Sequence, residues 1–368
     1  MRSTGALCGI TMKIAKHVRK LEAYTPGEQP KSLKVIKLNT NENPYPPSPE
    51  CAKVLAKFPL GHLRRYPDPV VAELRCELAR LARTTPERVF VGNGSDEVLS
   101  IAAQAFVEDD EAIGSLDPSY SLYKTLAAIR NVKWLGAKKL PDGTIAPLPK
   151  NVSMFLWTNP NAPTGEFAEP ETIAAFAKKF PGIVVIDEAY ADFARGNCME
   201  LATSEKNRNV IVMRTFSKSY SLAGLRVGWC VGPEDLVAAM DKVKDSYNVD
   251  AIAQAVALAA VRDQKWMLAN RDKVVKTRNR FAAALANRGW DVIPSESNFL
   301  FARPPSRESA KDLFAWLKTK NIFVRYFSGP KTGDRLRITI GTEGQMKTLL
   351  AAFDERSSVC GKLPGKQL

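Results

Sequence analysis

Short apolar runs alternate with longer amphipathic stretches between about Arg88 and Gly232. Each apolar run is followed by Gly, Pro, Asn, Asp or Ser, which are the residue types that end strands and form turns. The longer stretches carry apolar residues at helical spacing, and in the first of them Val98, Ile101 and Ala102 share one face. Strands that alternate with helices in this way are typical of a mostly parallel sheet with crossover helices.

Five segments are predicted as strands of this sheet, and polar residues follow directly at their carboxyl ends. They begin the stretches "RVFVGNGSDEVLSIAAQAF" (88–106), "EAIGSLDPSYSLYKTLAAI" (111–129), "SMFLWTNPNAPTG" (153–165), "GIVVIDEAYADF" (182–193) and "VIVMRTFSK" (210–218). Ligands of open α/β sheets bind outside the carboxyl ends of the strands. The polar residues at these ends are therefore the first candidates for a functional site.

The pattern changes after about Pro233 to long helical segments followed by short strands. The alanine-rich stretch 250–261 and the basic stretch 271–289 are predicted helices, and strands are predicted within 290–304, 322–327 and 335–342. We expect a smaller α+β domain here. The predicted division is an N-terminal segment, 1–45, whose later part joins the small domain, a large domain, 46–260, and the small domain, 261–368.

Length, charge and cysteine usage narrow the possible functions. A chain of 368 residues exceeds the size of a single core, which supports two domains. The net charge of +14 is spread without a block of like charges, so it favours small anionic ligands over nucleic acid or an anionic membrane. Six widely spaced cysteines and two histidines argue against a metal site and a disulfide scaffold. These features fit a cytoplasmic protein.

The N-terminus adds little to this picture. Its apolar stretch is too short for a usual signal peptide, and no run in the chain approaches the roughly 20 apolar residues of a membrane helix. We expect residues 1–11 to be a leader of unknown purpose.

Lys218 follows the apolar run Val210–Met213 in the segment "RTFSKSYSLAGLRVGW" (214–229). Most lysines lie at the surface. A lysine at the end of a buried strand loses hydration, which disfavours its charged form and leaves a free amine that can attack a carbonyl. Arg226, eight residues on, stays cationic and suits a phosphate group. Lys218 is therefore a candidate nucleophile and Arg226 a candidate phosphate ligand.

The segment "GNGSDE" (92–97) places a glycine turn at the start of a predicted helix. Free backbone N–H groups at a helix start bind anions. Ser95 and Asp96 are also residue types that cap ordinary helices. An anion site and simple helix capping therefore both stay open as interpretations. The spacing matches neither a P-loop nor a dinucleotide fingerprint, which disfavours ATP and NAD.

Asp187 follows four apolar residues, Ile183–Ile186, so its carboxylate is predicted to be buried. A buried carboxylate needs a cationic or hydrogen-bonding partner, and a protonated pyridine nitrogen is one such partner. An aspartate that caps the following turn is the alternative. Tyr190 lies three residues on, within reach of a ring hydroxyl. Tyr120 has a ring that can stack on a flat cofactor, although such tyrosines more often serve packing.

These motifs together resemble a known family. "TNPNAPTG" (158–165), "VVIDEAY" (184–190), "RTFSKSYSLAGLRVGW" and "RLRITIGT" (335–342) resemble, in this order, the fold type I pyridoxal-phosphate aminotransferases, over about residues 24–353. "LNTNENPYPPSP" (38–49), "RRYPDP" (64–69) and "VRYFSGP" (324–330) most resemble the histidinol-phosphate aminotransferases. The resemblance implies pyridoxal 5'-phosphate as cofactor and a transamination in histidine biosynthesis. It would convert L-histidinol phosphate and 2-oxoglutarate to imidazole acetol phosphate and L-glutamate.

The resemblance also implies roles for particular residues. Lys218 matches the Schiff-base lysine, Asp187 the partner of the ring nitrogen, Tyr190 the donor to the ring hydroxyl and Tyr120 the stacking ring. The phosphate-binding residues match at Ser95, Asp96, Thr215, Ser217 and Arg226. Tyr66 matches a tyrosine that reaches the phosphate from the neighbouring subunit, which implies a homodimer. Tyr24, Arg325 and Arg337 match the groups that hold the anionic end of the substrate.

One position departs from the family pattern. Many relatives have an asparagine directly before Pro-Thr-Gly that contacts the ring oxygen of the cofactor, whereas this chain has Ala162. Either Asn161 makes the contact from a shifted position, which we favour, or Tyr190 makes it alone. Ser219, next to Lys218, receives no role from the resemblance.

Three alternative functions remain at this point. Another enzyme of the same fold, such as an aromatic aminotransferase or a threonine-phosphate decarboxylase, would use the same lysine and phosphate site. A non-catalytic binding or regulatory protein on this fold has little need for the lysine, the aspartate and the two arginines together. A nucleic-acid-binding protein would explain the net charge, but no basic helix with interleaved aromatic residues supports it.

Overall fold

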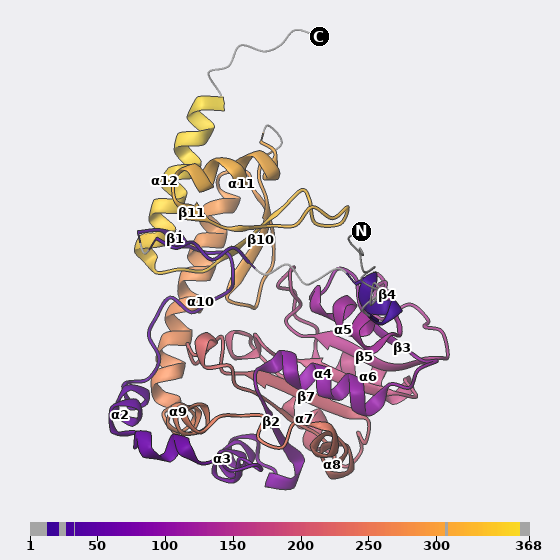
Figure 1. The fold of residues 1–368 in the computed structure, drawn as a ribbon. Coiled ribbons are helices and arrows are strands. Elements are labelled where there is room, and N and C mark those ends of the chain that lie inside the picture. The colour runs from indigo at the N-terminus through magenta and orange to yellow at the C-terminus, as the bar shows by residue number, and fades with distance from the viewer. Residues whose placement is uncertain (1–12, 22–26, 33, 306–307, 361–368) are drawn as a thin grey trace, which may run out of the picture.

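The computed structural model describes residues 13–21, 27–32, 34–305 and 308–360, whose strands form three sheets (Figure 1). The largest sheet has the strand order β2-β8-β7-β6-β5-β3-β4. Its strands are β2 (Val89–Gly92), β3 (Ala112–Leu116), β4 (Lys133–Ala137), β5 (Val152–Thr158), β6 (Ile183–Asp187), β7 (Val210–Thr215) and β8 (Gly228–Val231).

The five strands from β3 to β7 are parallel, so the predicted mostly parallel sheet is confirmed. β8 is antiparallel to both β2 and β7, which the sequence did not indicate. The connection from Thr215 to Gly228 explains this direction, because it holds a loop and the short 3-10 turn η4 (Ala223–Leu225) instead of a crossover helix. That loop carries Lys218.

Helices cover both faces of the large sheet. Apolar side chains of β7 alternate between two cores, with Val210 and Val212 on one face and Ile211 and Met213 on the other. This burial on both faces is why the central strands read as continuous apolar runs. The helices of this part are α2 (Pro49–Lys57), α3 (Ala72–Ala82), α4 (Ser95–Phe106), α5 (Leu122–Arg130), α6 (Pro170–Lys179), α7 (Met199–Thr203), α8 (Glu234–Val243) and α9 (Ala251–Arg262).

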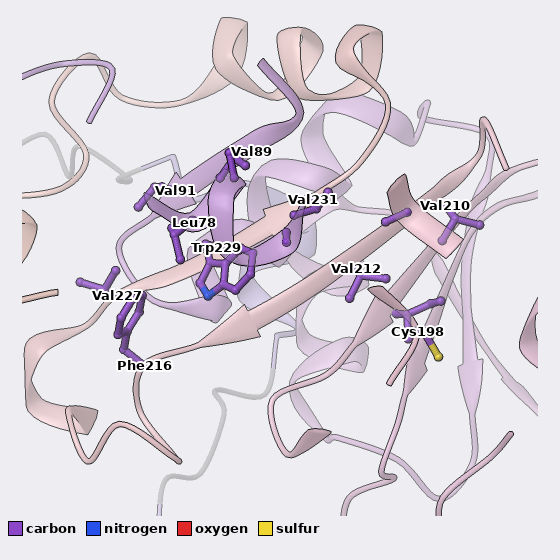
Figure 2. Close-up of a cluster of buried hydrophobic side chains, with 14 of the residues drawn as sticks. Leu78, Val89, Val91, Cys198, Val210, Val212, Phe216, Val227, Trp229 and Val231 are labelled. Carbon is purple, nitrogen blue, oxygen red and sulfur yellow. The ribbon is translucent and has the colours of Figure 1, made fainter. Parts of the chain in front are cut away.

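The loop after β7 is anchored by Phe216, which is fully buried. In Figure 2 its ring lies beside Val227, at the end of the row of side chains that Val210 and Val212 begin. The backbone N–H of Phe216 donates to the carbonyl of Val227, and the N–H of Leu222 donates to the carbonyl of Phe216. The loop therefore starts from a fixed point two residues before Lys218.

The long helix α10 (Gln264–Ala286) extends from the large sheet toward a smaller α+β part (Figure 1). The smaller part has a four-stranded sheet in the order β12-β13-β10-β9 and its own apolar core. The N-terminal segment joins it, because β1 pairs in parallel with β11. Its elements are β1 (Ile36–Lys37), β9 (Asp291–Ile293), β10 (Phe299–Arg303), α11 (Ala310–Thr319), β11 (Ile322–Phe323), β12 (Arg325–Tyr326), β13 (Leu336–Thr339) and α12 (Glu343–Cys360).

The remaining elements are short: α1 (Lys16–Arg19) and the 3-10 turns η1 (Leu60–Arg64), η2 (Pro86–Arg88) and η3 (Ala191–Phe193). The division of the chain after residues 45 and 260 stays a prediction. Across the described residues, we find no helix with the length and apolar character needed to cross a membrane.

Candidate active site

The carboxyl ends of β5, β6 and β7 place three polar segments at one edge of the large sheet. Thr158 at the end of β5 pairs in register with Asp187 at the end of β6, and Asp187 pairs with Met213 of β7. Lys218 follows three residues after β7 ends. The parallel register therefore brings Asp187 and the loop of Lys218 together although they are far apart in the sequence.

The side chain of Lys218 is held by a contact with the N-terminal segment. Its Nζ donates a hydrogen bond to the carbonyl of Thr40 at 3.2 Å and lies 5.7 Å from the ring centre of Tyr190. Burial, and after it the positive charge of Arg337, lowers the pKa of Lys218 from 10.5 to about 8. This shift has the direction expected from loss of hydration at the strand end, and it favours the unprotonated amine.

This pKa predicts how Lys218 reacts. Because only the unprotonated amine attacks a carbonyl, we expect the rate at which the cofactor-free protein captures pyridoxal phosphate to rise with pH around a midpoint near 8. Stopped-flow absorbance at a series of pH values measures that rate. Arg337→Met should move the midpoint upward, because it removes a neighbouring positive charge. A midpoint near 10.5 in the unaltered protein would contradict the burial of this amine.

Asp187 is buried with 3% of its surface exposed, as the apolar run before it predicted. Its Oδ2 accepts a hydrogen bond from the hydroxyl of Tyr123 at 2.8 Å, and its Oδ1 accepts one from the N–H of Ala189 at 3.0 Å. Burial raises the pKa of Asp187 to about 6. A carboxylate in this position gains from a cationic N–H donor, since its charge is otherwise poorly solvated.

Tyr190 is held by Asn41, whose Nδ2 donates to the tyrosine oxygen at 2.9 Å. Asn41 is itself fixed by Thr339 of β13, whose hydroxyl donates to Asn41 Oδ1 at 3.0 Å. The backbone of Asn41 has a positive φ of 57°, which is uncommon for a residue other than glycine and recurs at functional sites. The N-terminal segment thus fixes both Lys218 and Tyr190.

An anion cradle lies at the start of α4. Gly94 precedes the helix with a φ of 86° and has no side chain to cap it, so the N–H groups of the first turn stay open to a ligand. Arg226 approaches so closely that a Cβ on Gly94 would lie 2.4 Å from its Nη2. A Cβ on Gly228 would lie 2.4 Å from the backbone nitrogen of Ser95. The two glycines therefore keep open the space in which Arg226 and the helix start meet.

Polar groups from three segments line this cradle. Arg226 Nη2 is 3.4 Å from Asp96 Oδ2, and its Nη1 is 3.4 Å from Ser217 Oγ. Thr215 donates to Ser217 at 3.0 Å. A cation, hydroxyls and helix N–H groups together fit a phosphate group such as that of pyridoxal phosphate. Across the described residues, no group of three His, Cys, Asp or Glu side chains is arranged to hold a metal ion.

The importance of Gly94 is testable with a matched control. In Gly94→Ala the new methyl group would displace Arg226, so we expect the dissociation constant for pyridoxal phosphate to rise at least about tenfold. Gly143→Ala is the control, because Gly143 has a similar φ of 84° but nothing within 4 Å of its added Cβ. Fluorescence titration of both variants separates loss of the cradle from the backbone strain that they share. Equal affinities would contradict this account of the cradle.

Tyr120 and Asn161 lie beside the same edge. The hydroxyl of Tyr120 donates to Asp96 Oδ1 at 3.3 Å, and its ring packs edge-on against Tyr123. Asn161 is buried with its side chain engaged: its Nδ2 donates to the carbonyl of Pro118 and to Thr164, and its Oδ1 accepts from Ser119. Asn161 therefore supports the loop that precedes Tyr120.

Arg325 and Arg337 face each other as direct cross-strand partners on β12 and β13. Both guanidinium groups lie over the ring of Phe327, at 5.3 Å and 5.2 Å from its centre. Arg337 also donates to the carbonyl of Asn39 at 3.0 Å, and its charge acts on both Lys218 and Tyr190. The smaller sheet thus presents Arg337 toward Lys218, with Arg325 as its direct neighbour across the strands.

Two predicted residues remain, Tyr66 and Tyr24. Tyr66 is 78% exposed and stacks on Tyr247 with ring centres 4.3 Å apart, so it does not take part in this cluster within one chain. Tyr24 lies outside the described residues.

Tyr123 and Asn41, which support Asp187 and Tyr190, are not among the site residues predicted from the sequence. Tyr123 lies in a stretch predicted as an amphipathic helix and received no role of its own. Asn41 lay in a motif used only for the family resemblance. A signal for Asn41 was present, since asparagine is the residue type that most often takes a left-handed backbone after glycine.

Comparisons with known proteins show the family to which this chain belongs. Residues 33–353 match the family model "Aminotransferase class I and II". The histidinol-phosphate aminotransferase of Syntrophotalea carbinolica is 42% identical over 343 residues, which is 92% of this chain and 97% of that protein. Histidinol-phosphate aminotransferase 1 of Burkholderia pseudomallei is also 42% identical, over 92% of this chain and 97% of its own.

Solved structures share the fold. The crystal structure of histidinol-phosphate aminotransferase from Sinorhizobium meliloti in complex with pyridoxal-5'-phosphate superimposes with a TM-score of 0.84 at 24% identity. The superposition covers 94% of this chain and 98% of the Sinorhizobium meliloti chain. L-threonine-O-3-phosphate decarboxylase from Porphyromonas gingivalis superimposes with a TM-score of 0.77 at 21% identity, over 88% and 100% of the two chains.

Proposed function

Because this chain belongs to the class I and II aminotransferase family, and within it to the histidinol-phosphate aminotransferases, we propose that it transfers the amino group of L-histidinol phosphate to 2-oxoglutarate. The products would be imidazole acetol phosphate and L-glutamate. The observation that carries the choice of substrate is the cross-strand pair of Arg325 and Arg337 beside Lys218. Two cations can bind the substrate phosphate in one half-reaction and a carboxylate of the oxo acid in the other.

The cofactor of this enzyme is pyridoxal 5'-phosphate, which when bound supplies an electron-poor ring that stabilises negative charge on the substrate carbon. Ser95, Asp96, Thr215, Ser217 and Arg226 would hold its phosphate, and Asp187 would hold its ring nitrogen protonated. Tyr120 would stack on the ring. Position 162 is an alanine, and the amide of Asn161 is engaged by its neighbours, which supports Tyr190 as the partner of the ring hydroxyl.

Lys218 would act twice in each turnover. Its Nζ would hold the cofactor, and the same Nζ would accept and return a proton at the reacting carbon of the substrate. An amine with a pKa of about 8 suits both tasks near neutral pH. Thr40 and Tyr190 would keep the amine within the site between the two roles.

The direct test of this function is formation of glutamate. Purified protein, pyridoxal phosphate, L-histidinol phosphate and 2-oxoglutarate are incubated together, and glutamate is measured by coupled glutamate dehydrogenase. Phenylalanine or tyrosine in place of histidinol phosphate tests an aromatic aminotransferase, and release of CO₂ from threonine phosphate tests the decarboxylase. Preference for either of these substrates would replace the proposed one.

Substitution of Arg337 tests the proposed substrate site. In Arg337→Ala we expect the KM for histidinol phosphate to rise about 30-fold or more, because a charge-assisted, bidentate contact is lost, while the cofactor stays bound. Arg303→Ala is the matched control, since Arg303 lies on the same small sheet but pairs with Asp291. Steady-state kinetics and cofactor absorbance are measured together. Loss of the cofactor in Arg337→Ala would place this arginine in the phosphate cradle instead.

A homodimer is the proposed assembly, in which Tyr66 reaches the cofactor phosphate of the partner subunit. Support comes from large apolar side chains that are at least half exposed between residues 55 and 70: Leu55, Leu60, Leu63, Tyr66 and Val70. These residues are close together in the sequence, and exposed apolar patches mark interaction surfaces. Sedimentation equilibrium of the protein and of Leu63→Asp tests the assembly, with a dimer and a weakened dimer expected. A monomeric unaltered protein would exclude the shared site.

A cytoplasmic location is part of the same proposal. Four cysteines within the described residues, Cys51, Cys76, Cys198 and Cys230, are free thiols, which suits a reducing compartment.

A further inference from the structure

Ser219 follows the catalytic lysine directly and has a contact that the proposed reaction leaves unexplained. Its side chain is buried, with 2% of the residue exposed, and its hydroxyl donates to Oδ2 of Asp192. Asp192 belongs to η3, in the segment after β6. The residue next to Lys218 is therefore tied to the element that also presents Tyr190.

Arg214 extends this contact into a chain of buried and half-buried charges. Its Nη1 donates to Oδ1 of Asp192 at 3.1 Å, and its Nε and Nη2 donate to one oxygen of Glu188 at 3.0 Å and 2.8 Å. Glu188 directly follows Asp187, and its other oxygen accepts a hydrogen bond from the N–H of Cys198. A chain of hydrogen bonds, Glu188–Arg214–Asp192–Ser219, thus links the residue after Asp187 to the residue after Lys218.

The side chains of Glu188 and Arg214 are held in one arrangement by burial and by their hydrogen bonds. The side chain of Glu188 is fully buried and that of Arg214 is 16% exposed. Burial raises the pKa of Glu188, and the charge of Arg214 opposes that rise. Burying an ion pair gives little net stability, because desolvation offsets the attraction. A fully bonded network in a poorly hydrated site does, however, fix the geometry of the groups that it joins.

The backbone around Lys218 is held by a second set of contacts. Nδ2 of Asn43 donates to the carbonyls of Lys218 and Ser219, at 3.2 Å and 3.1 Å. The N–H of Ser221 donates to the carbonyl of Lys218 at 3.2 Å. These contacts fix the peptide plane after Lys218. They do not hold the side chain of Ser219, which is bonded to Asp192. Removing the Ser219 hydroxyl would therefore free one side of the loop without breaking the others.

We propose that Ser219, acting through Asp192 and Arg214, is a positioning residue that holds Lys218 in register with Asp187. This inference rests on the proposed function, since Lys218 must first attack the cofactor and later move a proton at a fixed carbon. A small displacement of a catalytic group lowers the rate of the chemical step more than it lowers binding. In Ser219→Ala we expect kcat to fall about tenfold, with the KM for both substrates changed less than about twofold.

The experiment uses Ser219→Ala, Asp192→Asn, the double variant and the control Ser153→Ala. Ser153 is suitable because its buried hydroxyl has no hydrogen-bond partner among the described residues. Three quantities are measured for each protein: steady-state kinetics, the rate at which the cofactor-free protein captures pyridoxal phosphate, and the melting temperature. The capture rate depends on the position of Lys218 Nζ and does not require turnover.

Three results support the proposal together: slower capture and lower kcat in Ser219→Ala, no further loss when Ser219→Ala is added to Asp192→Asn, and an unaffected control. A purely structural contact would instead lower the melting temperature while kcat and capture stayed unchanged, and that result would overturn the proposal. Losses that multiply in the double variant would also overturn it, because the two residues would then act independently. If the unaltered protein forms no glutamate, the proposed function fails, whereas the capture rates still test the positioning.

Discussion

Replacement of Lys218 by alanine is expected to abolish transamination, with kcat reduced roughly 10⁴-fold or more. The loss should be this large because the proposed function gives Lys218 two tasks, attachment of the cofactor and transfer of the proton. The burial that lowers its pKa to about 8 prepares one amine for both. The visible absorbance of the lysine-linked cofactor should disappear together with activity. Coupled glutamate assays and absorbance spectra of the purified variant measure the two losses.

A chemical readout separates this lysine from the others. After borohydride reduction, the unaltered protein should carry the cofactor irreversibly on the peptide that contains Lys218, as peptide mass spectrometry would show, and Lys218→Ala should carry none there. Lys206→Ala is the control, since Lys206 is exposed on the surface. A Lys218→Ala protein that still linked the cofactor and turned over normally would exclude the assignment.

The pattern of the sequence predicted the large sheet and its site edge because each depends on short-range signals. An apolar run buried on both faces, such as Val210–Met213, can be read without knowledge of the rest of the fold. The end of such a run also places Lys218 and Asp187 at the edge. The direction of β8 could not be read in the same way, since it depends on what the loop between Thr215 and Gly228 does in three dimensions.

The contacts that support Tyr190 and Asp187 could not be predicted from the sequence for a different reason. Asn41 contacts Tyr190 across 149 positions of the chain, and Tyr123 contacts Asp187 across 64. No local pattern specifies such pairs, because each residue alone is compatible with ordinary packing or a turn. The roles of the predicted site residues rest on the family resemblance. Their contacts in the fold show which of these roles each side chain is free to take. Asn161, for example, has its amide occupied by neighbours and is a weaker candidate for the ring oxygen than Tyr190.

The second large effect is expected at Asp187, where function and stability should change in opposite directions. In Asp187→Asn the ring nitrogen would lose its proposed carboxylate partner, so we expect kcat to fall roughly 10²–10³-fold. The cofactor-free variant should nevertheless be more stable than the unaltered protein at pH 8. Burial raises the pKa of Asp187 to about 6 from 3.8, which means that the fold disfavours the charged carboxylate.

The sign of the pH dependence follows from this shift. Because the folded pKa lies above the unfolded one, the stabilising contribution of protonated Asp187 is present below pH 3.8 and is lost as the pH rises to about 6. The free energy of unfolding of cofactor-free Asp187→Asn should therefore exceed that of the unaltered protein by about 3 kcal/mol at pH 8, and the difference should shrink as the pH falls below 6. Urea unfolding at several pH values measures it.

Addition of the cofactor should reverse this order, because a protonated ring nitrogen gives the buried carboxylate of the unaltered protein the partner that asparagine cannot replace. Asp110→Asn is the control, since Asp110 is exposed and should change neither stability nor activity. A variant that is less stable than the unaltered protein without cofactor would show that the bonds from Tyr123 and Ala189 outweigh the desolvation of Asp187. A variant that is equally active would show that the ring nitrogen has another partner.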